Sequence, residues 1–152
     1  RAFVVGRVEP VSDFDAALDW VQSHDVSSAA AVEGGQALDS GEVAGEIEWV
    51  RRSPNRLVLD VTVDRPAFLV LSQAWYPGWR CEVNERNARF WRSDGTLGGV
   101  YLEPGYHRVA FLYRPRRTMV GSGISLATAI MICAVLWSPR PRPEGQGGDK
   151  YD

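Results

Sequence analysis

Hydrophobic positions recur at every second residue through much of the stretch from 46 to 114, which is the pattern of half-buried β-strands. In the segment 57–63, Leu or Val occupies every odd position. The segment 68–71 is apolar at every position, as in a strand that is covered on both faces. This alternation predicts that the main body of the protein is built from strands.

Turn signals divide this stretch into short pieces, among them Ser-Pro-Asn at 53–55 and Asp-Gly at 94–95. About seven strands result, which is typical of a β-sandwich. Short connections favour antiparallel pairing. We therefore expect a mainly β fold, an antiparallel β-sandwich that is jelly-roll-like. The later strands are expected at 79–83, 88–92, 100–102 and 106–114, with a tight connection at 84–87.

The first 45 residues are expected to form an α/β extension of the main sheet at 46–118. Apolar β-formers at 1–8 predict a short strand. Ser12 is the expected N-cap of a short helix that ends near Ser23, because apolar residues recur there at helical spacing. A further strand is expected at 29–32 and a loop at 34–45.

Residues 119–137 are 19 residues without a charge, and 14 of them are apolar. A helix of this length rises about 1.5 Å per residue and just crosses a hydrocarbon core of about 30 Å. We expect a transmembrane helix here, a water-exposed domain at 1–118 and a disordered tail at 138–152. Small residues four apart in the span predict packing against further helices. These residues are Gly121, Ser125 and Ala129.

Charge is distributed unevenly along the chain. Residues 1–50 carry two Arg and ten acids, a net charge of −8, whereas residues 51–118 carry twelve Arg and six acids, a net charge of +6. The two halves can attract one another, or the basic half can face anionic lipid. The sequence leaves both interpretations open.

No group of side chains has the spacing of a catalytic or metal site. The two cysteines provide no disulfide framework, and neither histidine has partners at ligand spacing. We predict no catalytic residue, no cofactor, no metal and no nucleic-acid partner. The groups considered and set aside are His24, His107, Cys81, the acids Asp13, Asp15 and Asp19, and the arginines Arg86, Arg89 and Arg92.

The densest aromatic motif is Trp-Tyr-Pro-Gly-Trp at 75–79. Pro-Gly predicts a tight turn between large rings. Trp75, Tyr76 and Trp79 are therefore candidates for a contact with a glycan or with the lipid interface, where Trp and Tyr are enriched. The alternative is that they are core aromatics at the start of a strand.

Four pieces of the chain resemble the C-terminal extracytoplasmic module of the bacterial YfhO-type family of multi-pass membrane proteins. They are Leu-Val-Leu-Ser at 69–72, Tyr-Pro-Gly-Trp-Arg at 76–80, Val-Tyr-Leu-Glu-Pro-Gly-Tyr-His at 100–107 and Val-Ala-Phe-Leu-Tyr-Arg-Pro at 109–115. The chain departs from the family at 84–87, where Asp-Gly is usual, and at Tyr106, where Glu is common.

The resemblance implies an accessory domain of a multi-pass envelope protein that takes part in lipid-linked sugar transfer to cell-surface polymers. The family's catalytic acid is expected far upstream, so no catalytic residue carries over. The domain would be extracytoplasmic, the tail cytoplasmic, and the partners would be the membrane, upstream transmembrane helices and a glycan or lipid-linked sugar. The alternative is a β-sandwich interaction module, anchored by one span and non-enzymatic, that docks another envelope protein.

Overall fold

The computed structural model describes residues 1–113 together with Thr128, Ile130, Met131 and Cys133. The chain divides into two compact units, Arg1–Pro115 and Arg116–Asp152. The predicted span at 119–137 and tail at 138–152 lie outside the described residues except for these four, which are helical. The predicted packing residues Gly121, Ser125 and Ala129 also lie outside them. Within the part that is described, no helix is both long enough and apolar enough to cross a membrane.

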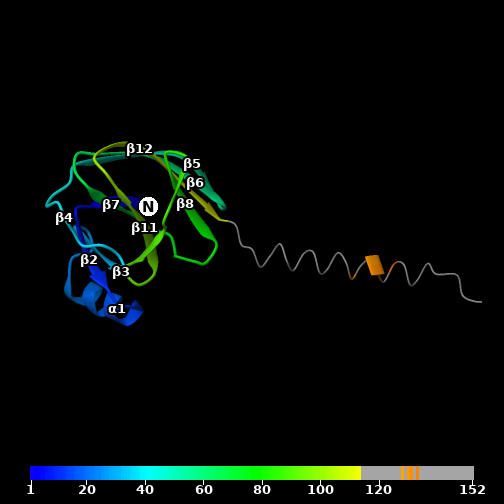
Figure 1. The fold of residues 1–152 in the computed structure, drawn as a ribbon, viewed down its shortest axis with the longest axis horizontal. Helices are drawn as coiled ribbons and strands as arrows, with labels where there is room; N and C mark the ends of the chain where they lie inside the picture. The colour runs from blue at the N-terminus through cyan, green and yellow to red at the C-terminus, as the bar shows by residue number, and fades with distance from the viewer. Residues whose placement is uncertain (114–127, 129, 132, 134–152) are drawn as a thin grey trace, which may run out of the picture. The chain divides into compact units, whose positions relative to one another are not determined.

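Residues 1–113 form two β-sheets and one short helix, so the predicted mainly β fold is confirmed (Figure 1). The first sheet has the order β1-β7-β11-β10-β3-β2-β4. Its strands are β1 (Ala2–Val5), β2 (Arg7–Val11), β3 (Ala29–Glu33), β4 (Leu38–Asp39), β7 (Ala67–Leu71), β10 (Trp91–Ser93) and β11 (Leu97–Leu102).

The second sheet has five strands in the order β5-β6-β12-β8-β9. They are β5 (Gly45–Ser53), β6 (Arg56–Val63), β8 (Trp79–Val83), β9 (Arg86–Ala88) and β12 (Gly105–Tyr113). All pairs in this sheet are antiparallel, as predicted. The β5–β6 pairing shifts register between Trp49 and Arg51, which leaves Val50 in a β-bulge.

One hydrophobic core lies between the two sheets, as expected for a sandwich. The alternating residues of 57–63 supply its β6 contribution, and Val109 and Phe111 of β12 lie beside them. From the other sheet, Leu69 and Leu71 of β7 complete the layer. The alternation at 57–63 therefore identified the buried face of β6 correctly.

A second core covers the opposite face of β7. Phe68 and Val70 are fully buried there against Val8 of β2 and Val32 of β3. The prediction that 68–71 is covered on both faces is therefore confirmed. The seven-stranded sheet must curl to bring β2 and β3 over β7, and Gly6 makes this geometry feasible because it is the sole residue between β1 and β2. A Cβ on Gly6 would collide with the Gly41 carbonyl oxygen.

The antiparallel prediction is wrong for one pair, because β2 and β3 are parallel. Between them lies α1 (Phe14–Ser23), a connection long enough for a parallel crossover. The expected N-cap was also displaced by one residue. Asp13, not Ser12, caps α1, since its Oδ1 accepts a hydrogen bond from the Ala16 amide at 3.0 Å.

Three other expected boundaries differ from those of the structure. The single strand expected at 1–8 is two strands, the loop expected at 34–45 contains β4, and the strand expected at 88–92 is divided between β9 and β10 in different sheets. The strands of residues 1–45 also belong to the main body, since β1 pairs with β7 and β3 pairs with β10.

Candidate functional site

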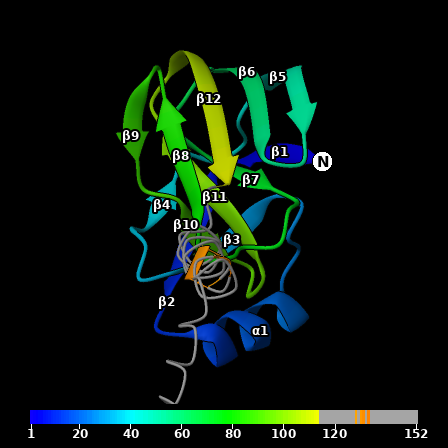
Figure 2. The same ribbon diagram turned by 90° about the vertical axis from the view of Figure 1, so that its right-hand side faces the viewer.

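The candidate site is one end of the five-stranded sheet, the end at which β12 finishes at Tyr113. We call it the exit end. Tyr113 is in register with Trp79, the first residue of β8, and its amide donates to the Asn55 carbonyl at 3.0 Å. The exit end therefore contains the end of β5, the β5–β6 turn, the first residues of β6 and β8 and the last of β12 (Figure 2).

Two of the predicted aromatic residues lie at the exit end. Trp79 packs against the inter-sheet core, and its ring centroid is 5.2 Å from that of Tyr113. Tyr76 precedes it in the turn, where the Trp79 amide donates to the Tyr76 carbonyl at 3.3 Å. The Tyr76 side chain is 63% exposed. Gly78 has a φ of 124°, a backbone conformation that residues other than glycine disfavour. This conformation agrees with the predicted Pro-Gly turn.

Trp75 has different partners. Its amide donates to the Thr96 carbonyl at 2.7 Å, and its ring lies 5.6 Å from the Arg92 guanidinium carbon. Trp75 is therefore held apart from Tyr76 and Trp79, and Tyr76 is the most exposed of the three. A glycan or lipid contact through these residues stays a prediction.

The exit end also carries four exposed arginines. They are Arg51 and Arg52 at the end of β5, Arg56 at the start of β6 and Arg80 in β8. The Arg52 guanidinium carbon lies 4.1 Å above the ring centroid of Trp49, a cation–π contact. None of the four forms an ion pair with another described residue. The acid nearest to Arg80 along its own strand is Glu82, two residues later.

The ion pairs of the described residues show how far the acidic first 50 residues and the basic remainder attract one another directly. Of the four, only Arg92–Glu33 joins the acidic first 50 residues to the basic remainder, with Nε and Oε1 3.2 Å apart. The other three are Arg7–Asp39, Arg65–Asp64 and Arg108–Asp60. Direct attraction between the halves is thus limited to one contact in this part of the chain, and the exit-end arginines are left for other partners.

Arg92 is held by its surroundings rather than presented to solvent. Besides the ion pair with Glu33, its Nε donates to the Gly95 carbonyl at 2.6 Å. Its guanidinium carbon lies 4.7 Å from the ring centroid of Phe14 and 5.6 Å from that of Trp75. These contacts join α1, β3 and the β10–β11 hairpin. We therefore assign Arg92 a structural role, although its charge and aromatic neighbours resemble a binding site.

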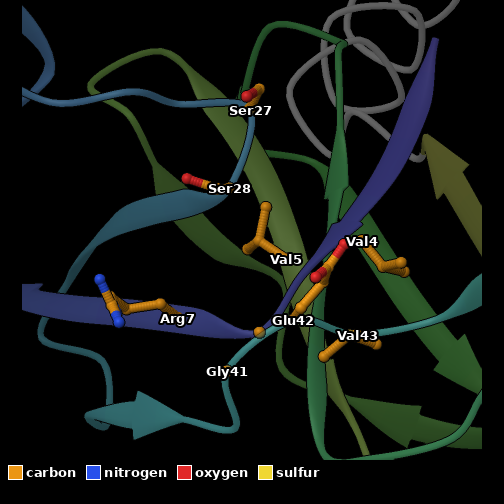
Figure 3. A pocket seen from close by; sticks show the side chains of 9 residues that line it. Val4, Val5, Arg7, Ser27, Ser28, Gly41, Glu42 and Val43 are labelled. Carbon is orange, nitrogen blue, oxygen red and sulfur yellow. The ribbon is translucent and has the colours of Figure 1, made fainter.

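A hollow of about 480 Å³ lies beside the β1–β2 junction (Figure 3). Its charged side chains are Arg7 and Glu42, with Ser27 and Ser28 nearby. Arg7 is already within 3.7 Å of Asp39. The charges of Arg7 and Glu42 sum to zero, so the hollow has no net charge that would attract an anion or a cation, and it is a weak candidate for a ligand site.

Both histidines that were set aside from the sequence have structural partners. His107 Nε2 lies 2.7 Å from the Glu103 carbonyl, and its Nδ1 lies 3.2 Å from Asn84 Nδ2. His24 stacks on Trp20, with centroids 4.4 Å apart. Burial raises the pKa of Cys81 to about 12, so this thiol is a poor nucleophile. Residues 1–113 and the four described residues beyond them contain no group of three potential metal ligands.

Sequence reasoning missed the exit-end arginines as a group. Arg51, Arg52 and Arg56 flank the turn at 53–55, a signal that was readable from the hairpin pattern. Arg80 is distant in sequence and joins them only through the β12 register. In comparisons with protein-family models, with curated proteins and with solved structures, nothing matches this chain.

Proposed function

We propose that this chain is the extracytoplasmic β-sandwich domain and C-terminal membrane anchor of a bacterial multi-pass envelope protein of the YfhO type. The observation that carries the proposal is the uncharged apolar stretch 119–137, separated from the end of β12 by only five residues. A helix of this length satisfies its backbone polar groups internally and is stable in hydrocarbon. The side chains of Ile130 and Met131 are 62% and 64% exposed, as lipid-facing residues are in the absence of lipid.

The motifs that resemble the family support the proposal because each of them forms a defined turn or strand start in the fold. Tyr-Pro-Gly-Trp at 76–79 makes the turn into β8. The Pro-Gly-Tyr-His piece at 104–107 begins β12, where His107 contacts the Glu103 carbonyl. Such motifs constrain the fold and do not carry chemistry. They therefore favour a shared domain architecture rather than a shared active site.

An accessory role in lipid-linked sugar transfer agrees with the chemistry of the domain. Cys81 is buried, and both His24 and His107 contact backbone carbonyls. Ser23 Oγ lies 3.0 Å from His24 Nδ1, but the same nitrogen lies 2.9 Å from the Trp20 carbonyl. Because that carbonyl can only accept a hydrogen bond, Nδ1 carries the proton and is not a base for Ser23. The catalytic steps would belong to the membrane part of the parent protein, and this domain would support or shape its extracytoplasmic face.

A second candidate function is an anchored interaction module that docks another envelope protein without catalysis. Exposed Tyr76 and the unpaired exit-end arginines favour it, since Tyr and Arg are enriched at protein interfaces. The open reading frame distinguishes the two. Further hydrophobic spans upstream of Arg1 would support the transferase parent, whereas an upstream region without such spans would support the module.

The anchor is tested by the accessibility of Cys133. In the full chain, Cys133 is exposed and Cys81 is buried, so Cys133 is the cysteine that a water-soluble maleimide can reach in detergent-free buffer. In lipid nanodiscs we expect labelling of Cys133 to slow by at least about tenfold, because mid-span thiols leave the aqueous phase. Mass spectrometry of each cysteine gives the rates.

The control is Asn55→Cys, an exposed position in the β5–β6 turn of the aqueous domain. It should label in nanodiscs at a rate far closer to its rate in buffer than Cys133 does. Equal labelling of Cys133 with and without lipid, or recovery of the chain in the aqueous fraction after carbonate washing of membranes, would contradict the anchor.

The glycan contact is tested through tryptophan fluorescence of the full chain during sugar titration. Tyr76 lies in the turn before Trp79, so a sugar stacked on Tyr76 should change the emission of that tryptophan. The change should disappear in Tyr76→Ala. Tyr106→Ala is the matched control, since Tyr106 is 56% exposed at the other end of β12. An unchanged spectrum at millimolar sugar would remove glycan binding from the proposed function.

A further inference from the structure

We propose that the exit end of the five-stranded sheet docks on the anionic phospholipid headgroups of the bilayer that holds residues 119–137. This inference rests on the proposed function, because it requires the anchor. It goes further by assigning a ligand class, the phosphates of anionic lipid, to one surface of the domain. It also fixes which end of the domain faces the membrane.

Connectivity places the exit end near the bilayer. The described strand β12 ends at Tyr113, and the apolar stretch begins at residue 119. An extended chain spans at most about 3.6 Å per residue, so six steps allow roughly 20 Å between Tyr113 and the start of the span. The β5–β6 turn lies beside this point, since the Tyr113 amide bonds to Asn55.

Charge complementarity identifies the lipid. Arg51, Arg52, Arg56 and Arg80 are exposed, and no described carboxylate lies within ion-pairing distance of them. An arginine near an anionic membrane surface contributes roughly fivefold in binding. The guanidinium group also binds phosphate oxygens through two parallel hydrogen bonds. The sequence contains three further arginines between Tyr113 and residue 119.

Two exposed apolar side chains complete the surface. Tyr76 is 63% exposed in the turn before β8, and Val50 is 52% exposed in the bulge of β5. Tyrosine is enriched at the lipid–water interface because its ring is apolar and its hydroxyl is wet. A surface that combines arginines with such residues can use both attraction to phosphate and shallow burial.

The far end of the same sheet has the opposite character. Glu46 and Glu48 lie at the start of β5, and Glu103 precedes β12. All three are exposed. An anionic bilayer repels this end and attracts the exit end, so the sheet has an electrostatic direction along β12. The preferred orientation has the C-terminal end of β12 toward the membrane.

The test uses the full chain in nanodiscs of phosphatidylcholine alone or of equal parts phosphatidylcholine and phosphatidylglycerol. In a Cys133→Ser background, a fluorophore is attached at Asn55→Cys or at Glu103→Cys, exposed positions at opposite ends of β12. Lipids with a nitroxide on the headgroup quench a nearby fluorophore. We expect quenching at position 55 that increases with phosphatidylglycerol and falls at high salt. Quenching at position 103 should stay weak.

A charge-matched pair of variants separates the exit end from net charge. Replacing Arg51, Arg56 and Arg80 with Gln should reduce the docking equilibrium constant by on the order of 100-fold and abolish the effect of phosphatidylglycerol. Replacing Arg7, Arg65 and Arg86 with Gln removes the same charge elsewhere and should preserve it. Circular dichroism verifies that both triple variants keep their strands.

The failures of the two proposals are distinguishable. A chain that inserts and protects Cys133, yet shows equal quenching at both positions or no dependence on phosphatidylglycerol, overturns the docking surface and leaves the anchor intact. Stronger quenching at position 103 overturns the proposed orientation and with it the surface. A chain that never inserts overturns both. If the exit-end variant loses quenching at position 55 equally in nanodiscs with and without phosphatidylglycerol, the arginines do not act through anionic lipid. That result would overturn the lipid surface in favour of a contact between the arginines and protein.

Discussion

At the scale of single residues, Asp94 is the buried acid whose environment is most unusual among the described residues. Its amide and its Oδ1 both bond to Ala31 of β3, at 2.8 and 2.9 Å. Its Oδ2 is buried without a hydrogen-bond partner. Burial raises the pKa of Asp94, and the Ala31 amide opposes this only in part. The carboxyl fixes the β10–β11 turn to β3 at the cost of burying a charge.

This environment predicts a pH dependence that Asp94→Asn removes. The ordinary pKa is 3.8, and below it Asp94 is protonated in both folded and unfolded chains. As the pH rises above 3.8, the unfolded chain loses the proton while the folded chain retains it up to the raised pKa. The free energy of unfolding of the original protein should therefore fall relative to Asp94→Asn in this window and then level off.

Urea unfolding of both proteins in detergent, at a series of pH values from 3 to 8, measures this difference. Comparison with the variant cancels Asp13, Asp25 and Asp60, whose hydrogen bonds lower their pKa values and give the opposite dependence. A difference that stays constant from pH 3 to 8 would show that the pKa of Asp94 is the same in both states.

Some features of single residues could be predicted from the sequence, and others are decided by backbone geometry or by a contact with a residue distant in sequence. His107, which was set aside as a site residue from its lack of partners at ligand spacing, makes two contacts within the fold. Ser12 and Asp13 are both good caps, and only the backbone geometry selects Asp13. The isolation of Trp75 from Tyr76 and Trp79 likewise depends on its long-range contact with Arg92.

At the scale of elements, the β8–β9 hairpin departs most clearly from ideal turn chemistry. Its two-residue loop is Asn84-Glu85, with φ values of 51° and 65°. Such loops favour Asn-Gly, because both central residues have positive φ. Asn84 tolerates the conformation and uses its Oδ1 to accept from the Arg108 amide at 2.9 Å. Glu85 has no comparable compensation, so the hairpin carries strain at one residue.

Glu85→Gly should therefore stabilise the protein, by about 0.5 to 1 kcal/mol in the free energy of unfolding. The gain from relieving the left-handed conformation exceeds the entropy that glycine adds to the unfolded chain. Denaturant unfolding measures it. Glu85→Ala retains a Cβ and should give no comparable gain, so equal stabilisation by Ala would attribute the effect to lost charge instead.

The elements that sequence could predict are those decided by their own pattern. β6, β7 and β12 alternate or stay apolar over five or more residues, and all three were predicted as strands. The buried positions of β6 and β7 were also predicted correctly. The division of 88–92 between two sheets and the parallel β2–β3 pair are decided by distant partners. A local pattern contains no information about which strand lies alongside, so these features required the structure.

At the scale of the whole molecule, charge that is divided along the sequence becomes charge that is divided along a sheet. Strand β5 begins with Glu46 and Glu48 and ends with Arg51 and Arg52. Antiparallel pairing then brings Arg56 and Arg80 to the same end. The sequence revealed the uneven charge but not its direction along the sheet, because that direction depends on the register of four strands, β5, β6, β12 and β8.

The bulge at Val50 has a consequence for how copies of this protein meet one another. Strand β5 forms an edge of its sheet, and at nine residues it is long enough to recruit a strand from a second molecule. The irregular register after Trp49 and the flanking charges interrupt the flat row of amides and carbonyls that such recruitment needs. Many copies of the chain can therefore be crowded together without pairing through this edge into β-aggregates.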